Sequence, residues 1–79
     1  SGTFPTLPTK GYLGLKDTGT QVKYLQMFLK WYGVYKDSVD GSFGENTEKA
    51  VVAFQAKEKL KKDKRFGPAC LARAKTVRK

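Results

Sequence analysis

The chain of 79 residues has no histidine and only one cysteine, Cys70. A single cysteine cannot form a disulfide within the chain. Without histidine, the Ser-His and Cys-His nucleophilic pairs and the usual zinc ligand sets are also missing. No apolar run approaches the roughly 20 residues that a helix needs to cross a bilayer. These absences disfavour a disulfide scaffold, a zinc site, a histidine-dependent hydrolase and a membrane span.

Acidic residues are scarce as well, because 7 Asp and Glu stand against 16 Lys and Arg, for a net charge of +9. Most of the excess lies in residues 57–79, and its densest part is the run Lys57, Lys59, Lys61, Lys62, Lys64 and Arg65. Such a run can be a solvated helix end, a surface that attracts an anion, or both. DNA, RNA, anionic lipid and the phosphate-bearing polymers of a bacterial wall all satisfy this charge.

Prolines number only three and aromatic residues make up 13% of the chain, which favours one folded domain. Residues 3–9, "TFPTLPT", are typical of an extended linker that proline stiffens. We therefore expect residues 1–12 to form a linker or amino-terminal arm that joins something upstream. Residues 13–79 then form the domain.

Apolar residues recur at helical spacing in three segments. They predict a first helix over about residues 20–32, with Thr18 or Thr20 as its cap and Gly33 at its left-handed end. A second helix is expected from Glu45 to about Lys59, and a short third one begins at Pro68. The residues of these stripes are Val22, Leu25, Leu29 and Tyr32; Thr47, Ala50, Val51 and Phe54; and Cys70, Ala74 and Val77.

The chain also repeats itself. The matching pairs are Val22-x-x-Leu25-Gln26 with Val51-x-x-Phe54-Gln55, and Asp40-x-x-Phe43-Gly44 with Asp63-x-x-Phe66-Gly67. Each half predicts a turn with an inward Phe, followed by a Gly that lets the backbone begin a helix at a sharp angle. We expect an all-α fold, a small three-helix bundle of two pseudo-symmetric half-repeats. No segment demands a strand, although residues 38–43 can pair briefly with the loop near Phe66.

These motifs resemble a known family, the three-helix peptidoglycan-binding domain found in bacterial and phage cell-wall lytic enzymes such as endolysins and autolysins. The resemblance covers about residues 13–75. The matching residues are Gly19, Val22, Leu25, Gln26 and Leu29, then Asp40, Gly41, Phe43, Gly44, Thr47, Ala50, Val51, Phe54 and Gln55, and in the last block Phe66 and Gly67. Lys64 and Cys70 depart from the pattern, standing where Gly and Thr are usual, and the glycine usual after the second helix is lacking around Lys59.

The resemblance implies a non-catalytic module that anchors a lytic enzyme to the wall. Its partners would be peptidoglycan, bound through a stem peptide or the glycan, and a catalytic domain upstream in the same chain. Anionic wall polymers are a further candidate partner. It implies no cofactor, no metal, no specific nucleic acid and no membrane. The expected location is the bacterial cell wall or the extracellular space. A phage endolysin would be made in the host cytoplasm and act on the wall.

Tyr24, Met27 and Trp31 line the side of the first helix opposite its apolar stripe, so one of the two faces should be exposed. Such a face can stack on a sugar ring or accept the methyl groups of a stem peptide. The alternative is packing against the arm or a neighbouring domain. The remaining candidate ligand contacts are Tyr32, Tyr35, Asp40 and Arg65.

Other polar residues favour structural roles. Gln26 and Gln55 at the core edge can satisfy backbone groups of the turns, and Asp40 can hold its own turn through backbone N–H groups. Cys70 in an apolar setting is expected to be buried and inert. Glu45 and Glu48 do not suggest a glycosidase, because such carboxylates must flank a substrate cleft and a unit this small offers little room.

Two other classes of function stay open. A basic nucleic-acid binder fits the charge and the interspersed aromatic residues, although no recognition helix is discernible. A helical pro-segment or docking domain of a protease is the third hypothesis, because similar helical units precede some metalloproteases. The segment around Cys70 lacks the cysteine switch motif of such pro-segments.

Overall fold

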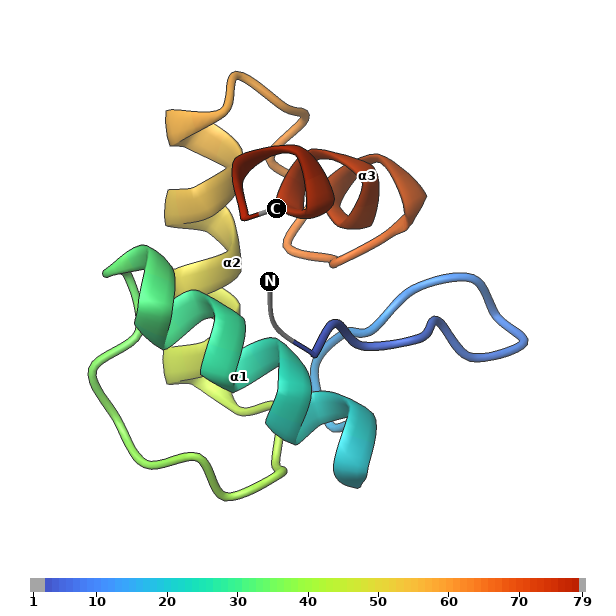
Figure 1. Ribbon diagram of the computed structural model, residues 1–79. Coiled ribbons are helices and arrows are strands. Elements are labelled where there is room, and N and C mark those ends of the chain that lie inside the picture. Colours follow the sequence, from blue (N-terminus) through green and yellow to red (C-terminus); the bar gives the residue numbers. More distant parts are fainter. Residues whose placement is uncertain (1–2, 79) are drawn as a thin grey trace.

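Three helices form where the sequence predicts them. A computed structural model describes residues 3–78 and contains α1 (Thr20–Tyr32), α2 (Glu45–Lys57) and α3 (Pro68–Val77). Figure 1 shows α1 crossing the first half of α2, with α3 lying toward the other end of α2. The prediction of an all-α fold with three helices is confirmed. Residues 1, 2 and 79, at the outer bounds of the expected linker and domain, lie outside the described residues.

Glycines border all three helices. Gly19, Gly44 and Gly67 occupy the positions before the first turns, and no side chain caps any of the three helices. The expectation that Thr18 or Thr20 caps α1 is therefore wrong. Gly33 has φ of 101°, and its N–H donates to the carbonyl groups of the last turn of α1, as predicted for a left-handed end.

The second helix ends two residues earlier than expected, at Lys57. Lys59 takes a left-handed backbone with φ of 60°, which a helix cannot continue through. Its N–H donates to Ala56 O at 3.2 Å, and Leu60 N–H donates to Gln55 O at 2.7 Å. This pair of bonds closes the helix as a Schellman motif, with lysine in the position where glycine is usual.

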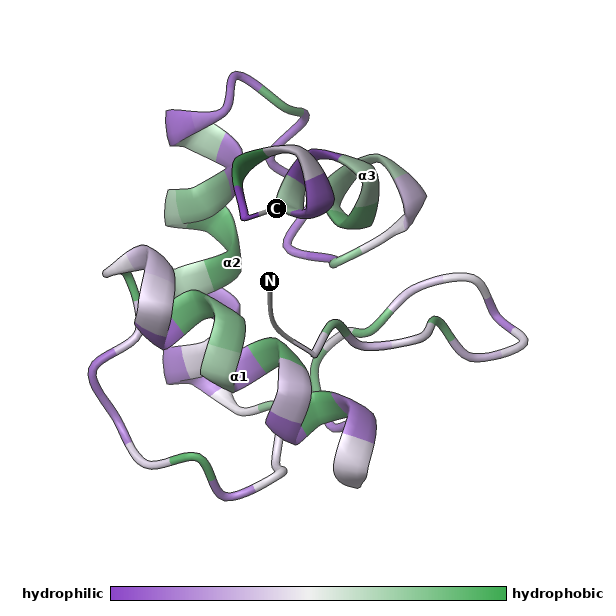
Figure 2. Cartoon of the chain, in the orientation of Figure 1, coloured by the Kyte–Doolittle hydropathy of each residue, from purple (hydrophilic) through white to green (hydrophobic). Residues whose placement is uncertain are grey.

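Aromatic rings from α1, α2 and the connections beside them lie in the core with aliphatic side chains, and α3 adds Cys70 and Ala74. The ring of Phe54 on α2 lies 5.4 Å from that of Phe28 on α1 and 6.2 Å from that of Phe66, which precedes α3. Phe43 and Phe66, the two repeated phenylalanines, are 1% and 0% exposed. In Figure 2 the green, hydrophobic segments of the helices face this interior, whereas the connection after α2 is mostly purple.

The loop at residues 13–18 joins both half-repeats. Leu13 forms a backbone bridge with Phe66, and Thr18 forms another with Ser42. Lys16 N–H also donates to Phe43 O, and Phe43 N–H donates to Asp17 O. The turns therefore pair with this loop and not with each other, so the expected pairing of residues 38–43 with the loop near Phe66 is wrong.

The amino-terminal arm packs onto α1. Pro5 is fully buried, the ring of Phe4 lies 6.0 Å from that of Phe28, and Thr6 N–H donates to Gln21 Oε1 at 2.7 Å. Leu7 is partly buried against the same core. Residues 3–7 are thus part of the packed body, although their sequence is typical of a linker.

Candidate ligand-binding surfaces

Gln26 fixes the first turn from inside the core. Its side chain is fully buried, and its Nε2 donates to Asp40 Oδ1 and to Ser42 O, both at 3.0 Å. Its Oε1 accepts from Gly41 N–H at 2.9 Å, so both ends of the amide are bonded to the turn. Ser42 N–H and then Gln26 lower the pKa of Asp40, which keeps this carboxylate charged and engaged within the turn.

Gln55 repeats this arrangement incompletely in the second turn. Its Nε2 donates to Asp63 Oδ1 at 2.9 Å and to Arg65 O at 2.8 Å, and it also approaches Cys70 Sγ at 3.3 Å. Its buried Oε1 has no hydrogen-bond partner among the described residues. The position that corresponds to Gly41 holds Lys64, in a left-handed backbone with φ of 68°. The second turn is therefore less well bonded than the first.

Cys70 takes the place of the buried Thr47 of the first half. Thr47 Oγ1 lies 3.1 Å from Gln26 Nε2, and Cys70 Sγ lies 3.3 Å from Gln55 Nε2 in the corresponding position. The thiol is 4% exposed. Its contacts are those of a core residue that helps to hold a turn.

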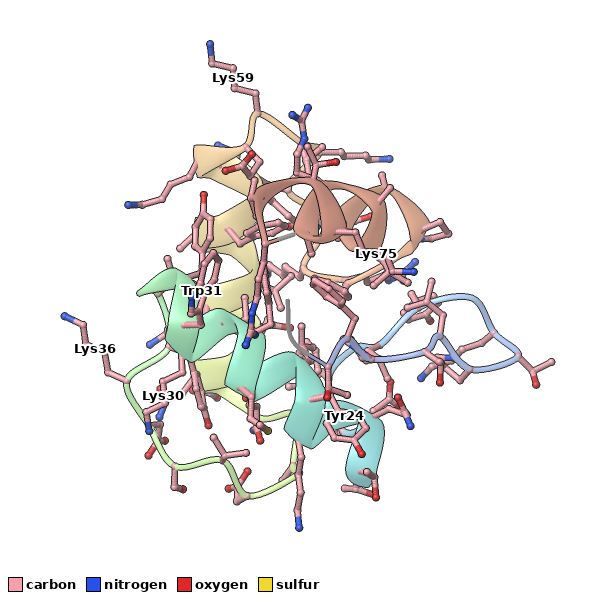
Figure 3. All side chains as sticks on the ribbon, in the orientation of Figure 1. Tyr24, Lys30, Trp31, Lys36, Lys59 and Lys75 are labelled. Carbon is pink, nitrogen blue, oxygen red and sulfur yellow. The ribbon has the colours of Figure 1, made fainter. Side chains whose placement is uncertain are left out.

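The outer face of α1 carries the largest exposed apolar side chains. Trp31 is 53% exposed and Met27 is 48% exposed, while Tyr24 is half-buried on the same face. Figure 3 shows Tyr24 and Trp31 near opposite ends of the helix. The Arg78 guanidinium lies 5.2 Å from the centre of the Trp31 ring system, and Phe28 lies behind it. We call Tyr24, Met27 and Trp31 the α1 platform.

Tyr32 and Tyr35, the other predicted ring contacts, are turned toward the core. Burial and then a hydrogen bond to Glu58 raise the pKa of Tyr32 to about 12, so its hydroxyl donates to that carboxylate and ties α1 to α2. Tyr35 is 4% exposed, and its hydroxyl donates to Ser38 O and lies 3.2 Å from Gln26 Nε2. These two rings offer edges to a ligand, whereas Trp31 offers a face.

An open groove of about 450 Å³ lies between the segment after α1 and the first turns of α2. Its lining consists of Val34, Tyr35, Lys36, Asp37, Asn46 and Lys49. Asn46 Nδ2 donates to Asp37 Oδ2 at 2.7 Å across the groove, and Ser38 N–H donates to Asp37 Oδ1. We call this the 34–49 groove. A smaller hollow of about 210 Å³ beside it includes Asp40.

Of the residues that line this groove, only Tyr35 is predicted from the sequence as a ligand contact. Asn46 and Lys49 occupy variable positions of the D-G-x-F-G-x-x-T-x-x-A pattern, and Lys36 and Asp37 lie in an irregular connection with no periodicity. The only signal was the cluster of polar and charged residues on both sides of the first turn.

Arg65 lies on the opposite turn, away from the other predicted contacts. Its guanidinium is 4.6 Å from the centre of the Tyr12 ring, and Lys10 Nζ is 5.0 Å from that ring. Lys10 also pairs with Asp17 at 2.6 Å. A groove of about 310 Å³ surrounds these side chains, and it also contains Glu48 and Asp63, so its charge is mixed.

The described residues hold no group of three His, Cys, Asp or Glu side chains that suits a metal ion. None of the helices in residues 3–78 has the length and apolar character for crossing a membrane. The only ion pairs in this part of the chain are Lys10 with Asp17 and Arg73 with Glu58. The lysines that follow α2 are therefore free to attract an anion.

The sequence of residues 18–73 matches a family described as "Putative peptidoglycan binding domain". No curated protein matches the chain. Among solved structures, the SleB N-terminal domain is similar with a TM-score of 0.86 and 30% identity, over 94% of this chain and 100% of that one.

Two further structures are longer than this chain. The Burkholderia AP3 phage endolysin has a TM-score of 0.79 and 35% identity, over 86% of this chain but 26% of its own. A peptidoglycan-binding protein from Clostridioides difficile, in complex with glutamine hydroxamate, has a TM-score of 0.77 and 35% identity, over 86% of this chain and 42% of its own. The chain thus spans less than half of these two relatives.

Proposed function

This chain belongs to the family of peptidoglycan-binding domains, and on that basis we propose that its α1 platform holds the wall polymer for a catalytic domain elsewhere in the protein. The domain itself is a non-catalytic, wall-binding module.

The exposure of Trp31 carries this proposal. A half-exposed indole beside an exposed methionine is unusual on a small soluble domain, because apolar surface gains free energy when it is removed from water. The rigid ring presents a flat apolar face to a sugar, and Met27 adapts to the methyl groups of a stem peptide. Tyr24 extends the same surface. Arg78 beside the indole supplies a cation for an acidic group on the ligand.

Tyr32, Tyr35, Asp40 and Arg65 are proposed as secondary contacts. Tyr35 and Asp40 line the hollows beside the first turn, so a ligand there touches the ring edge and the outer carboxylate oxygen. Arg65 offers its guanidinium in the groove beside Tyr12. All of these residues are held by other contacts, which makes them preformed but weaker anchors than Trp31.

The benefit to a parent enzyme is effective concentration. A tethered module that binds weakly to a repetitive wall keeps the catalytic domain near its insoluble substrate. A relative named as an endolysin supports a wall hydrolase as the parent. The place of action is then the bacterial wall, and for a phage enzyme it is reached from the host cytoplasm.

Sedimentation with purified peptidoglycan sacculi tests the proposal. We expect the isolated domain to sediment with them and Trp31→Ala to weaken the apparent Kd about tenfold, since loss of an aromatic contact costs about 1.5 kcal/mol. Val52→Ala is the control, because Val52 is a partly exposed apolar residue on α2 that lies outside the platform and lines none of the grooves described above. Failure of the unsubstituted domain to sediment refutes the proposal. Equal retention of the Trp31 and Val52 variants refutes the role of the platform.

Anionic wall polymers are the second proposed partner. Figure 3 shows Lys59 projecting from the top of the molecule. Lys59 and the neighbouring Lys61 and Lys62 form no ion pair with a carboxylate of the described residues. Binding through them should weaken steeply with salt. If walls stripped of teichoic acid lose the domain entirely, charge and not recognition of peptidoglycan explains retention. If DNA binds equally well at physiological salt, the nucleic-acid hypothesis replaces both.

A further inference from the structure

The 34–49 groove has the form of a small binding site that is separate from the α1 platform. It holds about 450 Å³ and is open to solvent, so a ligand would lie along it and not be enclosed. Val34 supplies a partly buried apolar wall, and the buried ring of Tyr35 forms part of the lining. The remaining lining residues are polar or charged and exposed, so a ligand must satisfy them as water does.

The groove is held in shape by bonds within its own segment. Lys30 Nζ donates to Asp37 O at 3.2 Å, and the Tyr35 hydroxyl donates to Ser38 O. Asn46 bonds the Asp37 carboxylate from α2, which joins the two walls. The groove is therefore largely formed before a ligand binds, so binding costs little conformational entropy of the protein.

Charge identifies the kind of group that fits. Lys36 and Lys49 line the groove, and neither forms an ion pair with a carboxylate of the described residues. The one carboxylate of the lining, Asp37, already accepts bonds from Ser38 N–H and Asn46 on its two oxygens. Two lysines against one carboxylate give the lining a net positive charge, which favours a carboxylate guest. Figure 3 shows Lys36 extending from the body on the side of Lys30.

Asn46 indicates which chemical group of the ligand lies next to its carboxylate. Its amide uses one N–H for Asp37, which leaves a second N–H and the Oδ1 acceptor for a ligand. A donor and an acceptor side by side match a peptide group. Val34 beside them suits a small apolar side chain such as a methyl group.

We propose that the 34–49 groove binds the free carboxylate end of a short peptide with small side chains, the carboxylate lying between Lys36 and Lys49. The inference deepens the proposed function and rests on it, because such a peptide end would come from the stem peptides of the wall. It assigns only the carboxylate end of the peptide to this groove, while the α1 platform contacts the glycan and the methyl groups of the rest of the stem peptide.

Titration of the isotope-labelled domain with N-acetyl-D-alanyl-D-alanine, followed by NMR, tests the proposal. We expect millimolar binding that shifts the Asn46 side-chain amide and the backbone amides of Val34 and Lys36. The same dipeptide with an amidated carboxyl end should bind at least about fivefold more weakly, because it lacks the charge that the lysines attract. Absence of shifts in the groove at about 20 mM dipeptide, above the millimolar Kd range, overturns the proposal.

Matched variants locate the effect. The double variant Lys36→Gln with Lys49→Gln should lose at least about fivefold in dipeptide affinity, because it removes both ammonium groups and no core contact. The double variant Lys57→Gln with Lys75→Gln is the control, since it removes the same charge from two exposed lysines outside the groove. Equal affinity of the groove variant and the control variant overturns the proposal.

The outcome is distinguishable from that of the proposed function. If the domain sediments with sacculi and Trp31→Ala weakens it, but the dipeptide leaves the groove unchanged, only the groove assignment fails. If the dipeptide binds as expected and sacculi do not retain the domain, the wall-binding role of the platform fails instead.

Discussion

The two repeated glutamines should differ sharply in what they contribute to stability. Gln26→Met removes a fully buried amide whose two ends are bonded to the first turn, whereas Gln55→Met removes one whose Oε1 has no partner among the described residues. Methionine keeps the length and apolar volume of the side chain, so the comparison isolates the polar groups.

The magnitudes follow from the bonds. Gln26→Met loses bonds to Asp40 and Ser42 and leaves the buried Gly41 N–H without an acceptor, at a total of about 3–5 kcal/mol. Gln55→Met also loses two good bonds, but it removes a buried acceptor that has no partner. Removing this acceptor offsets the loss in the free energy of unfolding by about 1–3 kcal/mol. The difference between the two should be about 2 kcal/mol. A domain of this size has a free energy of unfolding of about 4–12 kcal/mol, so the effect is large.

Urea unfolding followed by far-ultraviolet circular dichroism measures both losses. The slopes with denaturant should match that of the unsubstituted domain, so that the midpoints report stability alone. Equal losses, or a larger loss for Gln55→Met, would refute the idea that the second turn is the less well bonded one.

Two further predictions concern the backbone and pH. Lys59→Gly should raise the free energy of unfolding by about 0.5–1 kcal/mol. Glycine removes the strain of the left-handed backbone at this position, and this gain exceeds the cost of the extra conformational entropy that glycine gives the unfolded chain. Thermal unfolding should then shift upward by about 3–6 °C, while Gly33→Ala at the matching end of α1 should shift it downward. Stability should also fall as pH drops below about 4, because hydrogen bonds hold the pKa values of Asp37 and Asp40 below the ordinary 3.8. The unfolded chain therefore takes up these protons first. Urea midpoints at pH 5 and pH 3 measure the fall, and Asp40→Asn should reduce the difference between them; an unchanged difference would contradict the role of that carboxylate.

The helices could be predicted because their causes are local. Apolar spacing, Gly33 and Pro68 each act within a few residues, and the observed bounds follow them. The early end of α2 could not be predicted, because nothing in its composition shows that Lys59 adopts a left-handed backbone. The pairing of the turns with residues 13–18 was also missed, since it depends on how the three helices fit together.

The candidate site, too, could be predicted from the sequence only in part. An exposed face at Trp31 follows from the fact that one helix cannot bury two opposite apolar faces in so small a domain. The depth to which Tyr35 is buried does not follow, because its hydroxyl is satisfied by Ser38 and Gln26 from separate segments. The 34–49 groove joins Asp37 to Asn46 across a turn, which no sequence period records.

The bonds of residues 13–18 have a consequence for how the chain acquires its structure. Leu13 reaches Phe66 near one end of the chain, and Thr18 reaches Ser42 near its middle. The turn of each half-repeat therefore needs residues 13–18 for its backbone hydrogen bonds. A fragment that begins at Thr20 would contain the sequence of all three helices but would lack both backbone bridges. Folding should accordingly be all-or-none, and slower than is usual for helical proteins of this length, because it waits for distant segments to meet.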